Sequence, residues 1–395
     1  MRPAARVQAA IELLDEIIAA ARENGAAADT IIQRYFQTRR YAGSKDRRAV
    51  REFVYAAIRA AAEPPASGRA AMVALAAGEA GLEAAFDGSQ HGPVPIDEAE
   101  RVAALAPSYV PTWLVALLDP LVIAEEYPAL LERAPLDLRV NRLKGDRDAA
   151  RAILPESAPT PLSPLGLRLP EGFRVEEQEA WRSGLVEIQD EGSQLLAFAC
   201  EAGPDQLVVD LCAGAGGKTL ALGAEMANRG RLIACDIDRN RLGRMQPRLD
   251  RAGLAIVEAR LLNPRREREA LQDLAGRADV VLVDAPCSGT GTWRRNPELR
   301  WRLNPDRLGR LVRTQADLLD LAAELVRPGG MLVYAVCSLL AEEGRNQADF
   351  FSRRSAFISD EAFMEAGRSA GTGRLLTPAH DGTDGFFVAR WHRPC

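Results

Sequence analysis

The sequence predicts an α/β fold with a doubly wound parallel sheet, preceded by an all-α bundle and a small α+β segment. Three observations lead to this expectation. After residue 205, apolar strand-like runs alternate with helix-like stretches, which is typical of a parallel sheet covered by helices on both faces. Residues 1–130 are rich in alanine and carry apolar side chains at helical spacing. Between these parts, from about residue 138, short segments alternate apolar and polar side chains as strands do.

The composition fits a soluble globular protein of two or three domains. The chain has 395 residues, of which 47% are hydrophobic and 27% are charged. No apolar run approaches the roughly 20 residues of a membrane span, and the amphipathic start of the chain is unlike a secretory leader. We therefore expect a cytoplasmic protein with no membrane partner.

The cysteines and histidines restrict the chemistry that the chain can support. None of the six cysteines forms a CxxC pair, so no metal site is expected, and a reducing cytosol disfavours disulfides. His91 and His380 lie in turn-like stretches and His392 lies near the end, so a surface position explains all three. A general base is therefore expected among other groups. The net charge of −5 argues mildly against a nucleic-acid partner, although local charge matters more than the total.

The first domain, residues 1–130, is expected to be a helical bundle with a cationic turn. A second helix is predicted at about residues 28–37 and a third after Ser44. The stretch around this turn carries Arg34, Arg39, Arg40, Lys45, Arg47, Arg48 and Arg51, against Asp46 and Glu52. Two interpretations stay open, a solvated helix face and a phosphate-binding patch, since arginine forks match phosphate oxygens.

A small α+β subdomain is expected at residues 135–200, where residues 138–141 and 167–169 alternate like strands. Residues 201–395 are expected to form the last domain. Its predicted strands are 207–211, 231–236, 255–258, 279–284, 331–336 and 385–391, and its predicted helices are 218–228, 239–251, 307–326 and 342–353. In such a sheet, ligands bind at the carboxyl ends of the strands.

A glycine-rich loop joins the first strand of this sheet to its first helix. Glycines at this place let a ligand approach the backbone N–H groups of a helix N-terminus. A Walker A loop needs glycine six positions before the lysine, where Cys212 stands, and a GxGxxG pattern from Gly214 fails at Thr219. S-adenosylmethionine remains as the expected cofactor, because Asp236 at the end of the second strand can accept both ribose hydroxyls. By itself, Asp236 could instead be a helix N-cap.

Two cysteines, Cys287 and Cys337, each follow a run that is typical of a buried parallel strand. Because the carboxyl ends of such strands line one crevice, both thiols are expected there, next to Asp284. This arrangement suggests covalent catalysis by cysteine. The alternative is that cysteines are small buried apolar residues, and we assign that interpretation to Cys200, Cys212, Cys235 and Cys395.

At these motifs the sequence resembles the RNA (cytosine-5) methyltransferases of the RsmB/Nop/Sun type, in the bacterial ribosomal RNA branch. The matching segments are 210–219, 284–289, Cys337-Ser338 with Glu342, Glu343 and Asn346, and the lesser matches 139–144, 189–193 and 384–387. The resemblance runs from about residue 100 to the end and implies a Rossmann-like class I methyltransferase domain. The N-terminal helices are similar to a NusB-like RNA-binding domain.

The resemblance also implies a mechanism. A thiolate that adds to C6 of cytosine makes C5 an enamine-like carbon that can attack a sulfonium methyl group, after which the C5 proton is removed and the thiol eliminated. In this family the later cysteine attacks and the earlier one assists release, which implies Cys337 as nucleophile and Cys287 as release thiol. Asp284 would support the ring at N3, and Lys218 would orient Asp284 or lower a thiol pKa. DNA cytosine-5 enzymes use a Pro-Cys in the earlier motif, so Pro286-Cys287 leaves the two thiol roles open to test.

Binding residues are expected in two sets. The cofactor set is Cys212, Ala213, Gly214, Ala215, Gly216, Gly217, Lys218, Asp236, Asp238, Arg241 and Asp284. The RNA-binding set is Arg39, Arg40, Lys45, Arg47, Arg48, Arg294 and Arg295. Trp293 precedes the last two arginines, and an aromatic beside two cations suits a flipped base and its phosphates. A solvated loop is the alternative.

The sequence departs from the family pattern at two places. The third strand usually ends with an Asp near the adenine, but residues 258–264 have none at the expected position. Asn263 or Glu258 is the expected substitute. Val336 stands before Cys337, where Thr is common.

We therefore expect a monomeric enzyme that methylates C5 of a cytosine in RNA, with 16S ribosomal RNA as the substrate. A transfer RNA substrate is the alternative within the class. Two other readings are an RNA-binding ribosome-assembly factor with a vestigial catalytic domain, and a DNA methyltransferase. The presence of both motif cysteines and Asp284 counts against the vestigial domain, and the helical domain at the front counts against DNA.

Overall fold

A computed structural model describes residues 1–23, 25–104 and 106–395. Its contacts divide the chain into two compact units. The helical unit comprises residues 1–117, 124–132 and 293–304, and the sheet unit comprises residues 118–123, 133–292 and 305–395. The division into three successive domains that we expected from the sequence stays a prediction.

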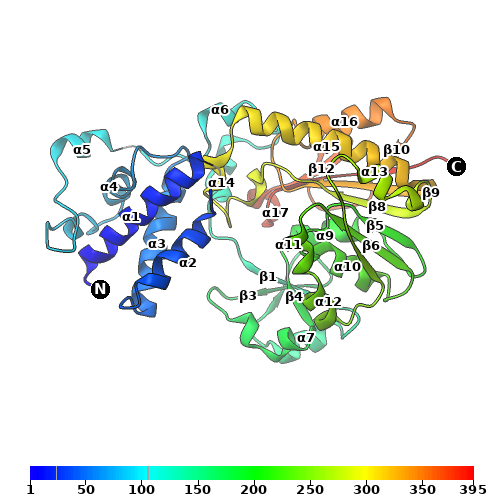
Figure 1. Cartoon of the computed structure of the whole chain (residues 1–395), viewed down its shortest axis with the longest axis horizontal. Helices are drawn as coiled ribbons and strands as arrows, with labels where there is room; N and C mark the ends of the chain where they lie inside the picture. Colours follow the sequence, from blue (N-terminus) through cyan, green and yellow to red (C-terminus); the bar gives the residue numbers. More distant parts are fainter. Residues whose placement is uncertain (24, 105) are drawn as a thin grey trace. The chain divides into compact units, whose positions relative to one another are not determined.

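The helical unit is built around its first helix, α1 (Pro3–Arg22). The other elements are α2 (Ala28–Thr38), α3 (Ser44–Ala60), α4 (Gly68–Gly78), η1 (Glu83–Ala85), α5 (Glu98–Ala103), α6 (Thr112–Val115), η2 (Ala124–Glu126), η3 (Pro128–Leu130) and α14 (Leu299–Arg302). Figure 1 shows α1, α2 and α3 side by side. The expected all-α bundle is confirmed.

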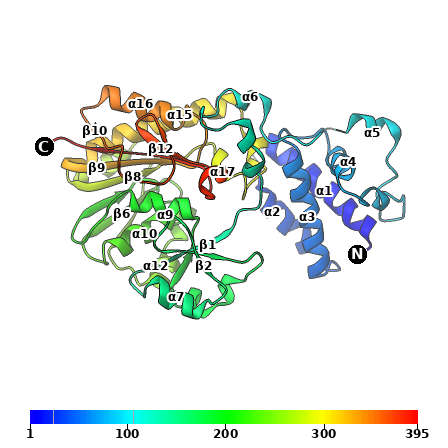
Figure 2. The same cartoon turned by 180° about the vertical axis from the view of Figure 1, so that it is seen from behind.

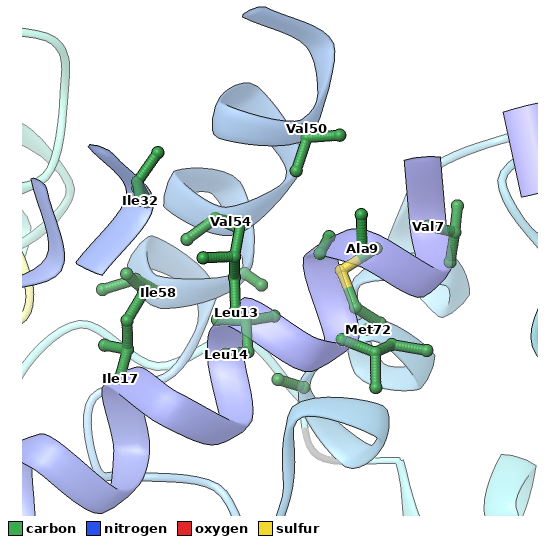
Figure 3. Packing of buried hydrophobic residues seen from close by; sticks show 14 of the residues in the cluster. Val7, Ala9, Leu13, Leu14, Ile17, Ile32, Val50, Val54, Ile58 and Met72 are labelled. Atoms are coloured by element: carbon green, nitrogen blue, oxygen red, sulfur yellow. The ribbon is translucent and has the colours of Figure 1, made fainter. Parts of the chain in front are cut away.

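Apolar side chains at helical spacing form the core of this unit, as Figure 3 shows. Leu14 and Ile17 of α1 are fully buried with Val54 and Ile58 of α3. At the start of α4, a Cβ on Gly68 would lie 2.1 Å from the carbonyl oxygen of Ile11, so only glycine allows this close approach to α1.

The sheet unit begins with a small antiparallel sheet of strand order β2-β3-β1-β4. Its elements are β1 (Leu136–Val140), α7 (Arg147–Ile153), β2 (Ala158–Pro159), β3 (Gly166–Leu169), η4 (Val175–Glu177), α8 (Glu179–Arg182) and β4 (Val186–Ile188). Glu187 of β4 forms ion pairs with Arg248 and Arg251, and Asn141 donates hydrogen bonds to two backbone carbonyls, one of them that of Ala252. These contacts fix the small sheet to the helix that contains Arg248 and Arg251.

The large sheet has the strand order β11-β12-β13-β9-β8-β5-β6-β7, with β10 paired to β13. Its strands are β5 (Leu207–Asp210), β6 (Arg231–Asp236), β7 (Val257–Leu261), β8 (Ala278–Asp284), β9 (Val326–Val336), β10 (Ile358–Ser359), β11 (Arg368–Ala370), β12 (Gly373–Leu376) and β13 (Phe386–His392). The helices of this part are α9 (Glu191–Phe198), α10 (Gly217–Glu225), α11 (Arg239–Gly243), α12 (Gln246–Ala252), α13 (Glu267–Ala270), η5 (Gln272–Leu274), η6 (Thr290–Thr292), α15 (Pro305–Leu325), α16 (Arg345–Arg354) and α17 (Pro378–Asp381).

Strands β5 to β9 are parallel, as expected, and they carry helices on both faces. Figures 1 and 2 show α15 and α16 on one face of the sheet and α9 and α10 on the other. The sheet is nevertheless mixed, because β13 pairs antiparallel with β9. The expectation of a purely parallel sheet is therefore wrong at this edge. None of the helices in the described part of the chain is long and apolar enough to cross a membrane.

Candidate active site

The glycine-rich loop lies between β5 and α10, and its backbone requires glycine. Gly214 and Gly216 have φ angles of +57° and +84°, in the left-handed region that other residues rarely adopt. A Cβ on Gly216 would also lie 2.6 Å from the Cγ atom of Met245. The loop therefore turns tightly into the N-terminus of α10.

Asp236, at the end of β6, holds this loop in place. Its Oδ2 accepts a hydrogen bond from the Gly214 N–H at 2.8 Å, and its Oδ1 accepts one from the Asp238 N–H at 2.8 Å. Arg241 lies 3.8 Å from Oδ2. Each carboxylate oxygen keeps a further lone pair, so Asp236 can still accept hydroxyl groups from a ligand. Asp238 caps α11 by accepting from the Asn240 and Arg241 N–H groups, which accounts for this residue without a ligand.

Asp210, at the end of β5, has an acceptor that the protein leaves unused. Its Oδ2 accepts from the Thr219 hydroxyl at 2.7 Å, whereas its buried Oδ1 has no hydrogen-bond partner among the described residues. Burial raises the pKa of Asp210 to about 7. A cationic donor from a ligand would satisfy this oxygen. Asp210 and Asp236 therefore place two carboxyl groups at the glycine loop, and each has acceptor capacity that the protein leaves unused.

Lys218, in the first turn of α10, forms an ion pair with Asp284 at the end of β8. Its Nζ donates to Asp284 Oδ2 at 2.7 Å, and only about a tenth of the lysine side chain is exposed. Burial alone would lower the pKa of Lys218, but attraction to Asp284 outweighs it and raises this pKa above its usual value. The lysine is therefore a charged group that fixes the orientation of the carboxylate, as we expected from its place in the sequence.

The structure brings Cys287 and Cys337 into contact, with their Sγ atoms 3.2 Å apart. The sheet brings the two loops that carry these thiols next to each other, because β8 and β9 are parallel neighbours in which Asp284 pairs with Ala335. The hydrogen bond with Cys337, together with burial, raises the pKa of Cys287 well above its usual value. Cys287 therefore keeps its proton at neutral pH, and its S–H can donate to the sulfur of Cys337.

Behind the thiols lies a polar cluster whose arrangement the sequence did not indicate. It consists of Ser288, Thr290, Gln315, Ser338 and Glu343. Glu343 was noted only as a match to the family pattern. A serine directly after each motif cysteine is the one signal that could have pointed to the cluster, and Gln315 gives no signal because it lies within the long helix α15.

The expected RNA-binding residues of the helical unit lie mainly at its surface. Arg40, Lys45, Arg47 and Arg48 are exposed, and Arg39 is partly covered and stacks on Tyr35. The nearby acidic Asp46 is compensated, because it pairs with the N-terminal ammonium and with Arg6. The turn between α2 and α3 therefore presents cations to solvent.

The segment after the Pro-Cys motif differs from the expectation. Trp293 and Arg294 are only 1% and 6% exposed, and they belong to the helical unit. A buried indole cannot stack on a base, so the interpretation of Trp293 and Arg294 as an RNA-binding pair is wrong in this structure. Of the two expected arginines, Arg295 is exposed.

The expected adenine substitutes also differ in position. Glu258 lies in the middle of β7 and forms ion pairs with Arg231 and Arg260, so it is engaged away from the carboxyl end of the strand. Asn263 follows the end of that strand and is exposed. Of the two candidates, only Asn263 stays a prediction.

Residues of the sheet unit match a known protein family. Residues 197–392 match the family model of the 16S rRNA methyltransferase RsmB/F. The ribosomal RNA small subunit methyltransferase B of Salmonella paratyphi B is 33% identical over 287 residues. This match covers 71% of the chain but 65% of the relative, so the chain spans less than two thirds of the length of the curated relatives it matches.

Two solved structures share the fold over most of this chain. The crystal structure of PH0851 is 23% identical with a TM-score of 0.76, and the alignment covers 98% of this chain and 99% of that one. A methyltransferase homologue from Pyrococcus horikoshii is 27% identical with a TM-score of 0.61, covering 68% of this chain and 89% of that one. The Rossmann-like architecture expected from the sequence is confirmed.

Proposed function

We propose that the chain, whose residues 197–392 match the family model of the 16S rRNA methyltransferase RsmB/F, is a member of that family and methylates C5 of a cytosine in RNA. S-adenosylmethionine is the proposed methyl donor and 16S ribosomal RNA the proposed substrate. The observation that carries the proposal is the contact of two thiols at the ends of adjacent strands, beside the carboxylate of Asp284.

The proposed cofactor site is the glycine loop with Asp210 and Asp236. Asp236 would accept the ribose hydroxyls, and the unused oxygen of Asp210 would accept from the ammonium group. Cys212, Ala213, Asp238 and Arg241 stay expected contacts of the same site. S-adenosylmethionine, when bound, supplies an electrophilic methyl group.

Cys337 is the proposed nucleophile. Its thiolate would form a bond to C6 of the cytosine, and the electron pair of the C5–C6 double bond becomes available at C5. Cys287 holds a proton and can donate its S–H to the sulfur of Cys337. After methyl transfer, a general base would take the C5 proton, the electron pair of the C5–H bond would re-form the C5–C6 double bond, and the C6–S bond would break so that Cys337 leaves as a thiolate. Cys287 would assist this release.

Asp284 and Lys218 would act on the base. A carboxyl group hydrogen-bonded at N3 supports the charge that develops as the ring becomes saturated. The ion pair with Lys218 fixes the orientation of the Asp284 carboxylate. Exposed cations of the α2–α3 turn would contribute phosphate contacts, which hold RNA without reading its sequence.

The first test is an adduct assay with Cys287→Ala, unmethylated 16S ribosomal RNA and S-adenosylmethionine. We expect a protein–RNA band that survives denaturant, because the variant attacks C6 but cannot complete release. The band should vanish in Cys287→Ala/Cys337→Ala, and Cys337→Ala alone should lower turnover by at least about 10³-fold.

Two other results would change the proposal. If wild type methylates the RNA but Cys287→Ala gives no band, the attack moves to Cys287. If wild type is inert on 16S ribosomal RNA, transfer RNA is tested next. Inactivity on both RNAs would contradict the proposed function and favour an RNA-binding assembly factor.

A further inference from the structure

The side chain of Glu343 connects the two loops that carry the thiols. Its Oε1 accepts from the Ser288 N–H at 2.8 Å, and its Oε2 accepts from the hydroxyls of Ser338, at 2.5 Å, and Ser288. Gln315 of α15 donates to Oε1 at 3.0 Å. Ser288 directly follows Cys287 and Ser338 directly follows Cys337, so one carboxylate is bonded to the residue next to each thiol.

The side chain of Glu343 is fully buried, although a carboxyl group is more favourably solvated in water. Glu343 is 0% exposed, and no Lys, Arg or His nitrogen of the described residues forms an ion pair with it. A buried carboxyl group is unfavourable unless donors replace water, and its two oxygens accept four hydrogen bonds, from the Ser288 N–H and hydroxyl, the Gln315 amide and the Ser338 hydroxyl. An apolar residue at this position would leave these four donors without an acceptor, so the carboxyl group holds the surrounding polar groups together.

The sheet alone does not determine where the sulfur atoms lie. One backbone hydrogen bond, from the Gly291 N–H to the Cys337 carbonyl at 3.1 Å, joins the two loops past the last ladder contact, which runs from the Ala285 N–H to the Ala335 carbonyl at 2.9 Å. Beyond it, Pro286 and Cys287 leave the strand direction. Gln315 also donates to the Pro286 carbonyl at 3.0 Å, so the same glutamine holds both this loop and Glu343.

A hydrogen bond from Tyr334 also fixes the backbone of Glu343. The hydroxyl of Tyr334 donates to the backbone carbonyl of Glu343 at 2.6 Å, and Tyr334 is fully buried in β9. Glu343 is therefore attached to the strand that leads to Cys337, while its side chain reaches the loop of Cys287.

From these contacts we propose that Glu343 is a positioning residue that holds the thiols of Cys287 and Cys337 within contact distance. Neither Ser288 nor Ser338 needs to touch the substrate in this arrangement. Contact between the sulfurs allows Cys287 to donate to Cys337 before attack and to act on the adduct afterwards, and this catalytic consequence rests on the proposed function. The geometric claim does not depend on it.

The distance between the thiols can be measured chemically without RNA. Diamide oxidises two neighbouring thiols to one S–S bond, and the two electrons and two protons reduce its azo bond to a hydrazine. We would follow the Cys287–Cys337 disulfide by peptide mass spectrometry and by thiol counts under denaturing conditions. Wild type should form this bond readily, and Glu343→Gln should form it at least about tenfold more slowly, since an amide cannot accept at both positions.

A matched control is available in the same unit. Glu191 is also 0% exposed, and its Oε1 accepts from the Leu162 and Ser163 N–H groups, both at 2.6 Å. Glu191→Gln should leave the rate of disulfide formation unchanged. An equal slowing in Glu191→Gln would show a general loosening of the fold and overturn the proposal, as would a wild-type rate in folded Glu343→Gln.

A second variant tests the proposal if Glu343→Gln is not folded, as judged by the absence of cooperative unfolding. Ser338→Ala removes only one of the bonds to Glu343 and should slow disulfide formation several-fold. A wild-type rate in that variant would overturn the proposal.

The catalytic consequence is tested separately on RNA. Glu343→Gln should lower kcat by at least about tenfold while KM for RNA changes less than about twofold, because a positioning residue does not bind substrate. A slow disulfide with an inactive wild type would leave the positioning role standing and contradict the proposed function. An active wild type with no effect of Glu343→Gln on kcat would contradict the catalytic consequence of the positioning, while the disulfide rate alone decides the geometric claim.

Discussion

At the scale of single residues, Asp210 is a buried acid whose pKa differs strongly between the folded and the unfolded chain. It is fully buried, and burial raises its pKa to about 7 even though the hydrogen bond from Thr219 lowers it. In the unfolded chain an aspartate has a pKa near 3.9. The folded protein therefore holds a proton on Asp210 over a pH range in which the unfolded chain has lost it.

The raised pKa of Asp210 determines whether the free energy of unfolding rises or falls with pH. The contribution of Asp210 to the free energy of unfolding is greatest below the pKa of the unfolded chain. It decreases as the pH rises, until the pH passes the folded pKa of about 7. Between about pH 5.5 and about pH 8, this single group should lower the free energy of unfolding by about 2 kcal/mol. Asp210→Asn should remove that part of the slope, because the amide does not titrate and still accepts from Thr219.

The measurement is urea unfolding of both proteins across this pH range without ligand. Equal pH slopes in wild type and Asp210→Asn would contradict the assignment. S-adenosylmethionine should flatten the wild-type slope if its ammonium group replaces the proton on Asp210, since a bound cation favours the carboxylate.

Site residues at strand ends could be predicted from the sequence, and residues that support them could not. Asp284 and Cys337 follow apolar strands, and the carboxyl ends of parallel strands meet in one crevice, so their proximity follows from the fold class. Gln315 lies inside a long amphipathic helix, and no local pattern distinguishes it from any other polar residue of that helix. Trp293 was misinterpreted because local composition does not reveal burial.

At the scale of elements, the short helix α14 completes the end of a helix that is distant in sequence. Arg300 donates to the carbonyls of Ile58 at 2.5 Å and Tyr109 at 2.8 Å, and the indole N–H of Trp301 donates to the carbonyl of Ala61 at 2.9 Å. The last carbonyls of a helix have no partner within it, so these donors satisfy the C-terminus of α3. Burial lowers the pKa of Arg300 to about 9, which still leaves it charged at neutral pH.

Arg300→Met should therefore destabilise the helical unit by about 3 kcal/mol, because buried carbonyls would lose a charged donor. Trp301→Phe is the matched change, since it removes one neutral hydrogen bond and should cost about 1 kcal/mol. Urea unfolding followed by far-ultraviolet circular dichroism gives both values. A cost for Arg300→Met no larger than that of Trp301→Phe would contradict the capping role.

Strand prediction succeeded where strands are buried on both faces. The runs at 279–284 and 331–336 are continuous apolar segments, and both are central strands in the structure. The edge strand β7 runs from Val257 to Leu261 instead of the predicted 255–258, because its side chains are largely exposed and give a weak apolar signal. The direction of β13 could not be predicted, since an apolar run does not encode the orientation of its pairing.

At the scale of the whole molecule, the helical unit is not one continuous stretch of chain. It takes residues 293–304 from between β8 and β9, and this segment contributes Trp301 to the hydrophobic core of the unit and Arg300 to its hydrogen bonds. A division made along the sequence cannot detect such an insertion, because each residue is assigned with its chain neighbours. It follows that residues 1–117 lack part of their own core.

Because the helical unit includes residues 293–304, we can predict what happens when the chain is split before Leu118. A fragment of residues 118–395 exposes Trp293 and Trp301 and should aggregate, since contiguous exposed apolar surface promotes association. The same fragment with residues 293–304 replaced by a Gly/Ser linker of equal length should be more soluble. Residues 1–117, co-expressed as a separate chain, should co-purify with the first fragment and not with the second.

Size-exclusion chromatography and pull-down of a tagged 1–117 chain measure these outcomes. Wild-type residues 118–395 should be recovered as a soluble complex only with the 1–117 chain, because α3 then regains the donors of Arg300 and Trp301. Equal recovery of both fragments by the 1–117 chain would contradict the prediction, since residues 293–304 would then contribute nothing to the helical unit. Selective recovery would mean that the helices of residues 1–117 and residues 293–304 form one cooperative structure, so that any truncation separating them destabilises both.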